Sequence, residues 1–473
     1  MIEELPRPSR FSLDAVAIRL AKELGESSVL RDEDILAAYA EDYSFSGRFL
    51  PDLVVRASST EDVAKVMRAA NDLRVPVTPR GLGSGKAGGA LPICGGIVLS
   101  LERMRRLKEI SREDMVVVAE PGIVTQDLMT AVESEGLFYP PDPNSLKISS
   151  FGGNVACNSG GPRALKYGVT RNYVLALELV TPTGEILRVG HRPIKGVTGY
   201  DLAGLIVGSE GTLAVITEIT ARLIPMPSAI ETALVCFADL ESASIAVTKI
   251  FGAGIVPRTL EFLDQNALDA VRKKTPGRFP ENAGALLILE TDATSANAAQ
   301  DELERAANVA MEHGALDVLV AQNDAQREKI WEPRRVLSMT LAETAPMKIS
   351  EDVSVPRSKI PALLTGVREI GERLAIRMAT YGHAGDGNIH VNLLFSEHEL
   401  ETAHRAAGEV MKRAVDLGGT ISGEHGIGIA KRKFLRLEQS EPLIDLQRGL
   451  KAVFDPNGIL NPGKIFPARG VRE

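Results

Sequence analysis

The stretch PRGLGSGKAGGALP, residues 79–92, connects two predicted strands, VPVTP at 75–79 and GGIVLSL at 95–101. Three of its glycines match the spacing G-x-G-x-x-G, which in a Rossmann fold leads directly into a helix. Here the stretch runs into another strand, so the sequence excludes a Rossmann fold. Consecutive glycines between strands can turn backbone N–H groups inward and let phosphate oxygens approach closely. The stretch is therefore predicted to bind phosphate, with a plain surface loop as the alternative.

Short alternating elements surround this loop and predict an α+β fold. A helix at 12–24 comes first, and Ser59 with Asp62 forms a predicted cap for a second helix. Alternation of apolar and polar residues then predicts further strands. The predicted elements are strand 52–58, helix 61–73, strand 115–122, a hairpin over 174–189 and strand 211–224.

The pattern changes near Pro225 and Pro227, which mark a predicted domain boundary. Beyond them, strands at 231–239, 259–264 and 284–292 alternate with helices at 241–252, 266–272 and 294–313. Four antiparallel strands with helices on one face would satisfy this order. The last fifty residues are predicted to be helical. The predicted domains are residues 1–227, 228–420 and 421–473.

Composition excludes several classes of function. The chain has 473 residues and a net charge of -8, and it contains no run of Lys and Arg that could follow a nucleic-acid backbone. The amino terminus lacks the pattern of a secretory signal, and no segment approaches 18 uninterrupted apolar residues. A cytoplasmic protein is expected, with docking onto a membrane complex left open.

The three cysteines, Cys94, Cys157 and Cys236, lie far apart and form no Cys-x-x-Cys pair. This spacing excludes a disulfide framework and the usual four-thiolate iron-sulfur site within the chain. If the protein handles electrons, they must leave through another molecule.

Two further segments are rich in glycine and small polar residues: 140–168 and VGSEGTLAVITE at 207–218. The first has little periodicity and would be long for a simple loop in a compact domain. Its backbone polar groups need partners, which favours a segment that wraps a ligand. The second, taken alone, is only a turn signal before a strand.

The strongest chemical signal is YGHAGDGNIHVN at residues 381–392. Asp386-Gly387 is a favoured two-residue hairpin turn, and such a turn would place His383 directly opposite His390 on one sheet face. Asn392 would point to the same face.

A second signal is SGEHGIG at residues 422–428, where glycines flank Glu424 and His425. His383, His390 and Glu424 make a sound three-ligand set for a zinc-like or manganese-like ion. His425 would remain free as a base. A hydrogen-bonded turn at a helix start is the alternative for this segment.

Together these segments resemble the FAD-linked dehydrogenases of the vanillyl-alcohol oxidase superfamily. The resemblance is strongest to the group of glycolate oxidase large subunits, D-lactate dehydrogenases and D-2-hydroxyglutarate dehydrogenases, and it covers nearly the whole chain. FDPNGILNPGK at 454–464 resembles the family's carboxyl-terminal signature. The resemblance implies a two-part FAD-binding domain of the PCMH type, a ferredoxin-like cap and a carboxyl-terminal helical segment that packs back on the FAD domain.

The resemblance also implies roles for individual residues. Arg334, with Arg335 as a substitute, would bind the substrate carboxylate near Lys348, while His425 removes a proton and His383, His390 and Glu424 hold the metal. The FAD would be non-covalent, because the loop at 79–90 contains no histidine. The implied FAD-binding residues are Pro79, Arg80, Gly81, Leu82, Gly83, Ser84, Gly85, Gly88, Pro141, Asp142, Ser145, Ser150, Gly152, Gly153, Asn154, Asn158, Gly161, Tyr167, Gly168, Glu210, Gly211, Ile216, Asn392 and Asn461.

The resemblance implies metal-assisted oxidation of a small D-2-hydroxy acid, of the glycolate or D-lactate type, to the 2-oxo acid. Zinc is the expected metal, with manganese and iron as alternatives. Electrons would pass to an electron-transfer flavoprotein, an iron-sulfur subunit or a quinone, and a homo-oligomer stays open. The rival functions are a non-catalytic subunit that only holds FAD and a non-redox flavoenzyme like alkylglycerone-phosphate synthase.

Overall fold

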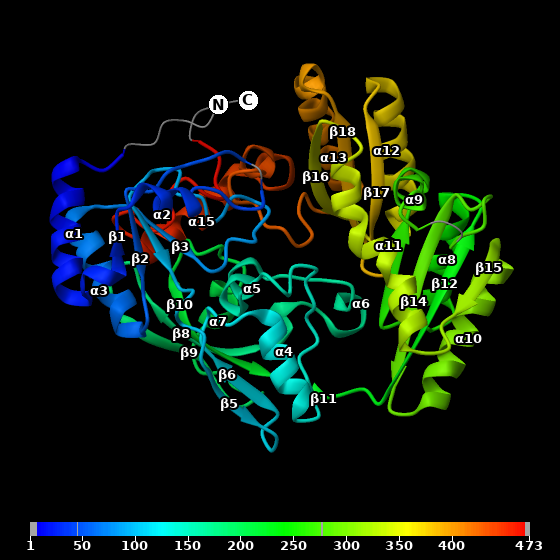
Figure 1. The fold of residues 1–473 in the computed structure, drawn as a ribbon, viewed down its shortest axis with the longest axis horizontal. Coiled ribbons are helices and arrows are strands. Elements are labelled where there is room, and N and C mark those ends of the chain that lie inside the picture. Colours follow the sequence, from blue (N-terminus) through cyan, green and yellow to red (C-terminus); the bar gives the residue numbers. More distant parts are fainter. Residues whose placement is uncertain (1–6, 45, 276–277, 469–473) are drawn as a thin grey trace.

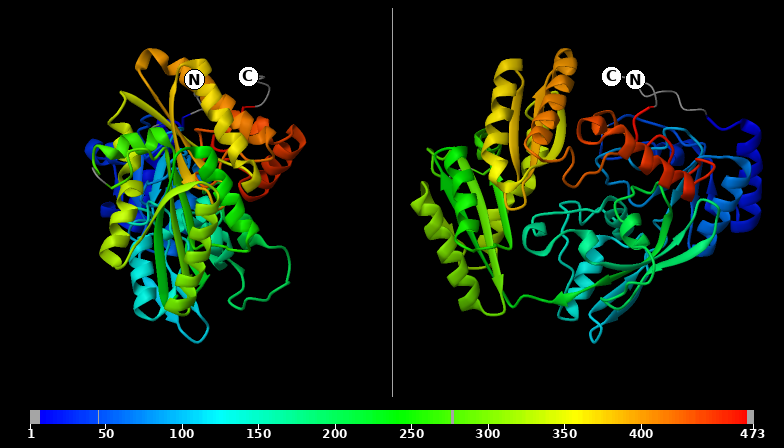
Figure 2. Two further views of the ribbon diagram at one scale, coloured as in Figure 1. Left: turned by 90° about the vertical axis from the view of Figure 1, so that its right-hand side faces the viewer. Right: turned by 180° about the vertical axis from the view of Figure 1, so that it is seen from behind.

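A computed structural model describes residues 7–44, 46–275 and 278–468 (Figure 1). Its main sheets have four, five and seven strands. The first two form an N-terminal part, residues 10–225, and the third forms a central part, residues 229–416. The predicted α+β class is confirmed. Figure 2 shows from behind that the central part stands beside the N-terminal part.

The helices cover the sheets or connect their strands. Their bounds are α1 Arg10–Leu24, α2 Glu33–Ala38, α3 Thr60–Leu73, α4 Thr125–Ser134, α5 Phe151–Cys157, α6 Ala164–Tyr167, α7 Leu202–Ile206, α8 Leu240–Gly252, α9 Gln265–Arg272, α10 Ala296–Glu312, α11 Asp324–Ala342, α12 Ile360–Leu374, α13 Leu400–Asp416, α14 Leu435–Glu438 and α15 Glu441–Phe454.

The first sheet has the order β1-β2-β4-β3, with β1 Val29–Leu30, β2 Leu53–Arg56, β3 Val77–Arg80 and β4 Ile97–Ser100. Strands β3 and β4 are parallel neighbours, yet the glycine loop between them contains no helix. The exclusion of a Rossmann fold is therefore confirmed. The Ser59 hydroxyl accepts a hydrogen bond from the backbone N–H of Asp62 at 3.1 Å, which is half of the predicted cap of α3.

The second sheet is antiparallel, with the order β5-β6-β10-β8-β9. Its strands are β5 Leu107–Ser111, β6 Val116–Ala119, β8 Val174–Val180, β9 Ile186–Gly190 and β10 Val215–Arg222. Strands β8 and β9 are the predicted hairpin. A two-stranded ribbon of β7 Leu137–Phe138 and β11 Ile224–Pro225 lies at the exit to the central part.

The central sheet has seven strands, so the prediction of four was wrong. Its order is β15-β12-β14-β13-β17-β18-β16, with β12 Ala229–Phe237, β13 Thr259–Leu263, β14 Ala285–Ala293, β15 Ala315–Val320, β16 Met347–Ser354, β17 Arg377–His383 and β18 Asn388–Phe395. Strand β16, with the sequence MKISEDVS, is too polar to be recognised as a strand from its composition.

Helices cover both faces of this sheet, which corrects the prediction of one helical face. Helices α8, α10, α12 and α13 pack on one face, and α9 and α11 pack on the other. The face under α9 and α11 carries the polar residues described below.

The carboxyl-terminal segment is only partly helical, because residues 421–431 and 455–468 contain no helix. The backbone N–H of Val77 donates to Ile459 O at 2.8 Å, and that of Asn461 donates to Val77 O at 2.7 Å. These bonds bring the carboxyl-terminal signature against β3. The domain bounds at 227 and 420 stay predictions. Within the described ranges, no helix is both long enough and apolar enough to cross a membrane.

Candidate active site

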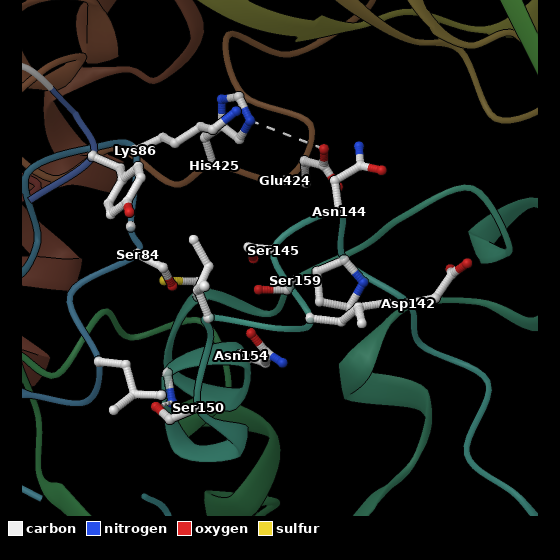
Figure 3. A pocket seen from close by; sticks show the side chains of 18 of the residues that line it. Ser84, Lys86, Asp142, Asn144, Ser145, Ser150, Asn154, Ser159, Glu424 and His425 are labelled. Carbon is white, nitrogen blue, oxygen red and sulfur yellow. Dashed lines mark hydrogen bonds and ion pairs between the residues drawn. The ribbon is translucent and has the colours of Figure 1, made fainter. Parts of the chain in front are cut away.

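A cavity of about 980 Å³ lies between the N-terminal and central parts. The glycine loop and the segment 142–163 line one side of it, and the central part supplies Arg334, Tyr381 and His390. Figure 3 shows Ser84 and Lys86 on the glycine loop, Ser150 and Asn154 at the bottom of the view, and Glu424 with His425 at the top. This volume is of the size that a large organic ligand or cofactor occupies.

Most of the predicted FAD-binding residues line this cavity. They are Pro79, Arg80, Gly81, Leu82, Gly83, Ser84, Gly85, Asp142, Ser145, Ser150, Gly152, Gly153, Asn154, Glu210, Gly211 and Ile216. They come from three segments that lie far apart in the sequence, and the fold brings all three to one wall.

Eight predicted FAD-binding residues do not line the cavity: Gly88, Pro141, Asn158, Gly161, Tyr167, Gly168, Asn392 and Asn461. Several of them hold the cavity walls instead. The Tyr167 hydroxyl donates to Asp292 at 2.7 Å, and Asn158 ends α5 in a left-handed conformation. Asn461 Nδ2 donates to Gly89 O and Glu210 O, while Asn392 Nδ2 donates to Ala379 O. A sequence motif therefore includes both the residues that face the ligand and the residues that hold the cavity walls, and it does not distinguish the two.

Gly81 shows why the cavity wall needs a glycine. A Cβ atom at this position would lie 2.2 Å from the Ser150 hydroxyl oxygen. That hydroxyl caps α5, because it accepts a hydrogen bond from the backbone N–H of Gly153 at 3.2 Å. A side chain at 81 would therefore displace the cap or push the loop into the cavity.

The histidine hairpin differs in register from the prediction. Four residues, 384–387, separate β17 from β18, so Asp386-Gly387 is not a two-residue turn. His383 faces Asn388, and His390 faces Tyr381. The two histidines are therefore diagonal neighbours on one face. They still meet, because a diagonal pair lies within reach of large side chains, and their ring centroids are 5.3 Å apart.

His383, His390 and Glu424 can direct one ligand atom each to a common point, with these atoms all within 4.8 Å of one another. Glu424 Oε1 lies 3.6 Å from His383 Nε2 and 3.5 Å from His390 Nε2. His383 Nε2 is buried and has no hydrogen-bond partner among the described residues. A buried polar atom without a partner is costly, and a divalent cation would satisfy it. The residues therefore fit a metal ion.

Glu261 was missed by the sequence analysis. Its carboxylate accepts hydrogen bonds from His383 Nδ1 and from Arg334 Nε, the latter at 2.7 Å. Burial would raise the pKa of Glu261, but the charges of His383 and Arg334 lower it to about 2. Burial likewise opposes the charged form of His383, but Glu261 raises its pKa well above the usual range. A carboxylate behind a ligating histidine orients the imidazole and increases its basicity.

Arg334 and Arg335 both line the cavity, but only Arg334 is buried. It is 5% exposed, stacks on the Tyr381 ring at 4.6 Å and lines the cavity. Its Nη2 has no hydrogen-bond partner among the described residues. Arg335 is half-exposed and pairs with Glu328. The buried arginine thus has a free donor to offer an anion.

Lys348 lies behind the cavity wall, and its ammonium donates to the Ser338 carbonyl at 2.8 Å and to the Ser338 hydroxyl at 3.1 Å. Burial, with a smaller contribution from Lys86, lowers the pKa of Lys348 to about 8. Lys348 would therefore act on the substrate only indirectly, by holding Ser338, which does line the cavity.

Asp352 was also missed, and it holds the predicted base. His425 Nδ1 lies 3.1 Å from Asp352 Oδ1, and the backbone N–H groups of Glu424 and His425 donate to Asp352 Oδ2. Lys431 is a further partner of this carboxylate. Burial would raise the pKa of Asp352, but His425 and Lys431 lower it well below the usual range. An ionised Asp352 fixes the Nδ1–H tautomer of His425 and leaves Nε2 able to accept a proton.

The loop that carries Glu424 and His425 is also fixed to the N-terminal part. Glu210 accepts hydrogen bonds from the backbone N–H groups of Ile427 at 2.8 Å and Gly428 at 2.7 Å. Gly428 has a φ of 47°, and a Cβ there would lie 1.9 Å from Ala87 O of the glycine loop. Close backbone approach explains the glycines of SGEHGIG.

The fold and the cavity define a two-part nucleotide-binding protein whose cavity adjoins a histidine and carboxylate cluster. Residues 51–190 match the FAD binding domain family model, and residues 226–465 match the model for the C-terminal domain of FAD linked oxidases. The chain belongs to the FAD-linked oxidase family, binds FAD and is an oxidoreductase.

Three relatives match over nearly their whole length. Glycolate oxidase subunit GlcD of Bacillus subtilis is 40% identical, over 90% of this chain and 92% of that protein. D-lactate dehydrogenase of Anaerostipes hadrus is 37% identical, over 94% and 96%. D-2-hydroxyglutarate dehydrogenase of Stutzerimonas stutzeri is 34% identical, over 93% and 96%.

Solved structures share the fold. A substrate-bound p-cresol methylhydroxylase superposes with a TM-score of 0.81 at 15% identity, and 98% of each chain is covered. An alkyldihydroxyacetonephosphate synthase superposes with a TM-score of 0.74 at 19% identity, over 98% of this chain and 87% of that one. At such identities the likeness concerns the fold alone.

The Gly81 contact gives a testable prediction. Gly81→Ala should weaken FAD binding about tenfold, roughly 1.4 kcal/mol, because the new methyl group displaces the Ser150 cap. Fluorescence titration of the apoprotein with FAD measures this. Gly449→Ala, in α15 with no heavy atom within 4 Å of the added Cβ, is the control and should bind FAD normally. Equal affinity of both variants would contradict this account of the loop.

Proposed function

We propose that the protein is an FAD-linked dehydrogenase that oxidises a small D-2-hydroxy acid to the 2-oxo acid with the help of a divalent metal. The single observation that carries the proposal is the meeting of Glu424 and two buried histidines beside His425, a base candidate held by Asp352. The relatives named for glycolate, D-lactate and D-2-hydroxyglutarate support the substrate class.

His383, His390 and Glu424 would hold the metal, with zinc expected and manganese or iron as alternatives. The metal would supply Lewis acidity to a bound carboxylate and hydroxyl, which makes the hydroxyl easier to deprotonate. Glu261 would then position both sides of the substrate pocket, because its carboxylate accepts hydrogen bonds from the metal ligand His383 and from Arg334.

His425 is placed to act as the general base. Its Nδ1–H is committed to Asp352, so Nε2 would take the proton of the substrate hydroxyl. The FAD that the glycine loop and the segment 142–163 would hold supplies the two-electron acceptor for this oxidation when it is bound. Arg334 would bind the carboxylate through its free Nη2, and its stacking on Tyr381 fixes the plane of the guanidinium.

The site argues against the rival functions. A subunit that only holds FAD has no need of a buried histidine pair, or of a base with its own carboxylate. A non-redox flavoenzyme, an alkyldihydroxyacetonephosphate synthase, shares the fold at 19% identity. Similarity at that level is no evidence for a shared function. Three carboxylates converge on the histidines, the buried Glu261 and Asp352 and the partly buried Glu424, and this favours proton abstraction beside a cation.

The electron acceptor is proposed to be a separate protein, such as an electron-transfer flavoprotein or an iron-sulfur subunit. The relatives of Bacillus subtilis and Escherichia coli are each named as a subunit of glycolate oxidase. In the described part of the chain, Cys94, Cys157 and Cys236 are separate free cysteines rather than a cluster.

The substrate class and the metal can be tested together. Under anaerobic conditions, glycolate or a D-2-hydroxy acid should bleach the bound flavin, and the L-enantiomers should not. Removing the metal with a chelator should abolish bleaching, and added Zn²⁺ or Mn²⁺ should restore it, because the hydroxyl then loses its Lewis acid. Bleaching that resists complete, independently measured metal removal would refute the metal assignment.

His425→Ala should retain FAD and metal but slow flavin reduction by about 10²- to 10⁴-fold, because it removes the imidazole that Asp352 orients to take the hydroxyl proton. Stopped-flow absorbance of the flavin measures the rate at saturating substrate. His404→Ala, on α13, is the control and should reduce at the normal rate. An unchanged reduction rate in His425→Ala would remove this residue from the mechanism.

Glu261→Gln should weaken metal affinity about 10- to 100-fold, because the neutral amide no longer polarises His383. Metal content after dialysis against graded chelator measures this directly, without an activity assay. Glu290→Gln is the control: Glu290 is also a buried glutamate of the central sheet, but it binds Thr232 and Trp331 rather than a histidine. If both variants keep their metal equally well, Glu261 has no role at the metal site.

A further inference from the structure

The outer edge of strand β9 and the loop that follows it form an uncovered apolar surface. We name residues 186–200 the β9 edge surface. Ile194, Val197 and Tyr200 are 76%, 98% and 95% exposed, and Ile186 and Leu187 of β9 are each more than 40% exposed. Single exposed apolar residues are normal, but here five of them fall within one edge strand and the loop that follows it.

Hydrogen bonds and ion pairs hold the start of the loop at 191–200 in place. Arg192 donates to both carboxylate oxygens of Glu109, at 2.9 and 2.6 Å, and to Asp114 at 2.7 Å. The backbone N–H of His191 donates to Leu175 O, and Gly196 packs so closely on the His191 ring that a Cβ there would lie 2.3 Å from it. The root of the loop is thus tied to the β5–β6 hairpin, while its apolar tip is left in solvent.

Strand β9 is the last strand of its sheet and pairs only with β8 among the described residues. The bonds Thr181 N to Glu185 O and His191 N to Leu175 O fix the alternation of the ladder. It follows that the N–H and C=O groups of Ile186, Arg188 and Gly190 point away from β8. An exposed apolar edge strand invites pairing with another chain.

The opposite edge of the same sheet is protected. Strand β5 has the sequence LKEIS, and its Lys108 and Glu109 are held in ion pairs with Glu218 and Arg192. Charged side chains on an edge strand disfavour pairing. Strand β9 carries one charged side chain, Arg188, which extends back across its own sheet to Glu178 and Glu218. The β9 edge is therefore the less protected of the two.

We infer that the β9 edge surface is the contact between two copies of this chain, with the two β9 strands antiparallel about a two-fold axis near Arg188. Antiparallel pairing of a strand with itself is self-complementary, as a two-fold interface requires. The facing Arg188 side chains would not repel strongly, because each is paired with Glu178 at 2.8 Å.

Charge complementarity supports a second copy as the occupant. A two-fold axis at residue 188 brings Glu185, at one end of β9, to the His191–Lys195 end of the other copy. Glu185 and Lys195 are exposed, and neither takes part in an ion pair in the described ranges. An anionic lipid surface fits less well, because the exposed charges are of both signs, with Glu185 and Asp201 at the two ends of this segment and Lys195 between them.

Light scattering after size exclusion of the FAD-loaded chain tests the inference. We expect a dimer, and Val197→Asp or Tyr200→Asp should raise its dissociation constant at least tenfold without changing FAD content or flavin reduction. Arg188→Pro removes an N–H group that points away from β8, and it should likewise raise the dissociation constant of the dimer. Val453→Asp, at an equally exposed apolar residue of α15, should stay dimeric.

Cross-linking locates the contact. In a mixture of ¹⁵N-labelled and unlabelled chains, a zero-length carbodiimide should join Glu185 of one copy to Lys195 of the other. A monomer at all concentrations, a dimer that the two tip variants leave unchanged, or tip-dependent flotation of a monomer with phosphatidylglycerol vesicles would each overturn the inference.

Discussion

The backbone of the loop at 422–428 is hydrogen-bonded to two carboxylates, Asp352 and Glu210, that belong to different parts of the fold. Asp352, on β16 of the central part, receives two backbone N–H groups and the His425 imidazole. Glu210, in the N-terminal part, receives the backbone N–H groups of Ile427 and Gly428. Because both carboxylates bind the loop within five residues, the loop cannot follow one part without straining the other. The position of His425 over the cavity therefore depends on how the two parts are docked.

The face of the central sheet that meets the cavity carries a row of polar residues across four strands. The strand registers place Glu261 beside His383, Tyr381 beside His390, and His390 beside Asp352. Such a row is expensive in a buried sheet unless every member has a partner. Each member either binds its neighbour or reaches a group on α11 or on the loop at 422–428, so the row ties the chemistry to the register of the sheet.

The sequence predicted this arrangement only where local chemistry decides it. Consecutive glycines between two strands identified the cavity loop, and the order of histidines around Asp386-Gly387 identified a hairpin, although its turn is two residues longer than predicted. Glu261 and Asp352 could not be predicted, because their roles depend on partners more than seventy positions away in the sequence. A lone carboxylate within an apolar strand was the available signal. The polar sequence of β16 concealed both the strand and its function.

The balance of buried charge explains why the site favours a cation. Glu261 is matched by Arg334, and Asp352 is matched by Lys431. Glu424 has only imidazoles as partners in the described part of the chain. An unpaired buried carboxylate is unfavourable, and the only relief available within the protein is a proton on a histidine. His383 takes that role, since Glu261 and Glu424 both raise its pKa, while burial and the neighbouring charges lower the pKa of His390 well below its usual range. A divalent ion would neutralise Glu424 and leave both imidazoles as ligands, which is the physical reason for proposing a metal at this point of the fold.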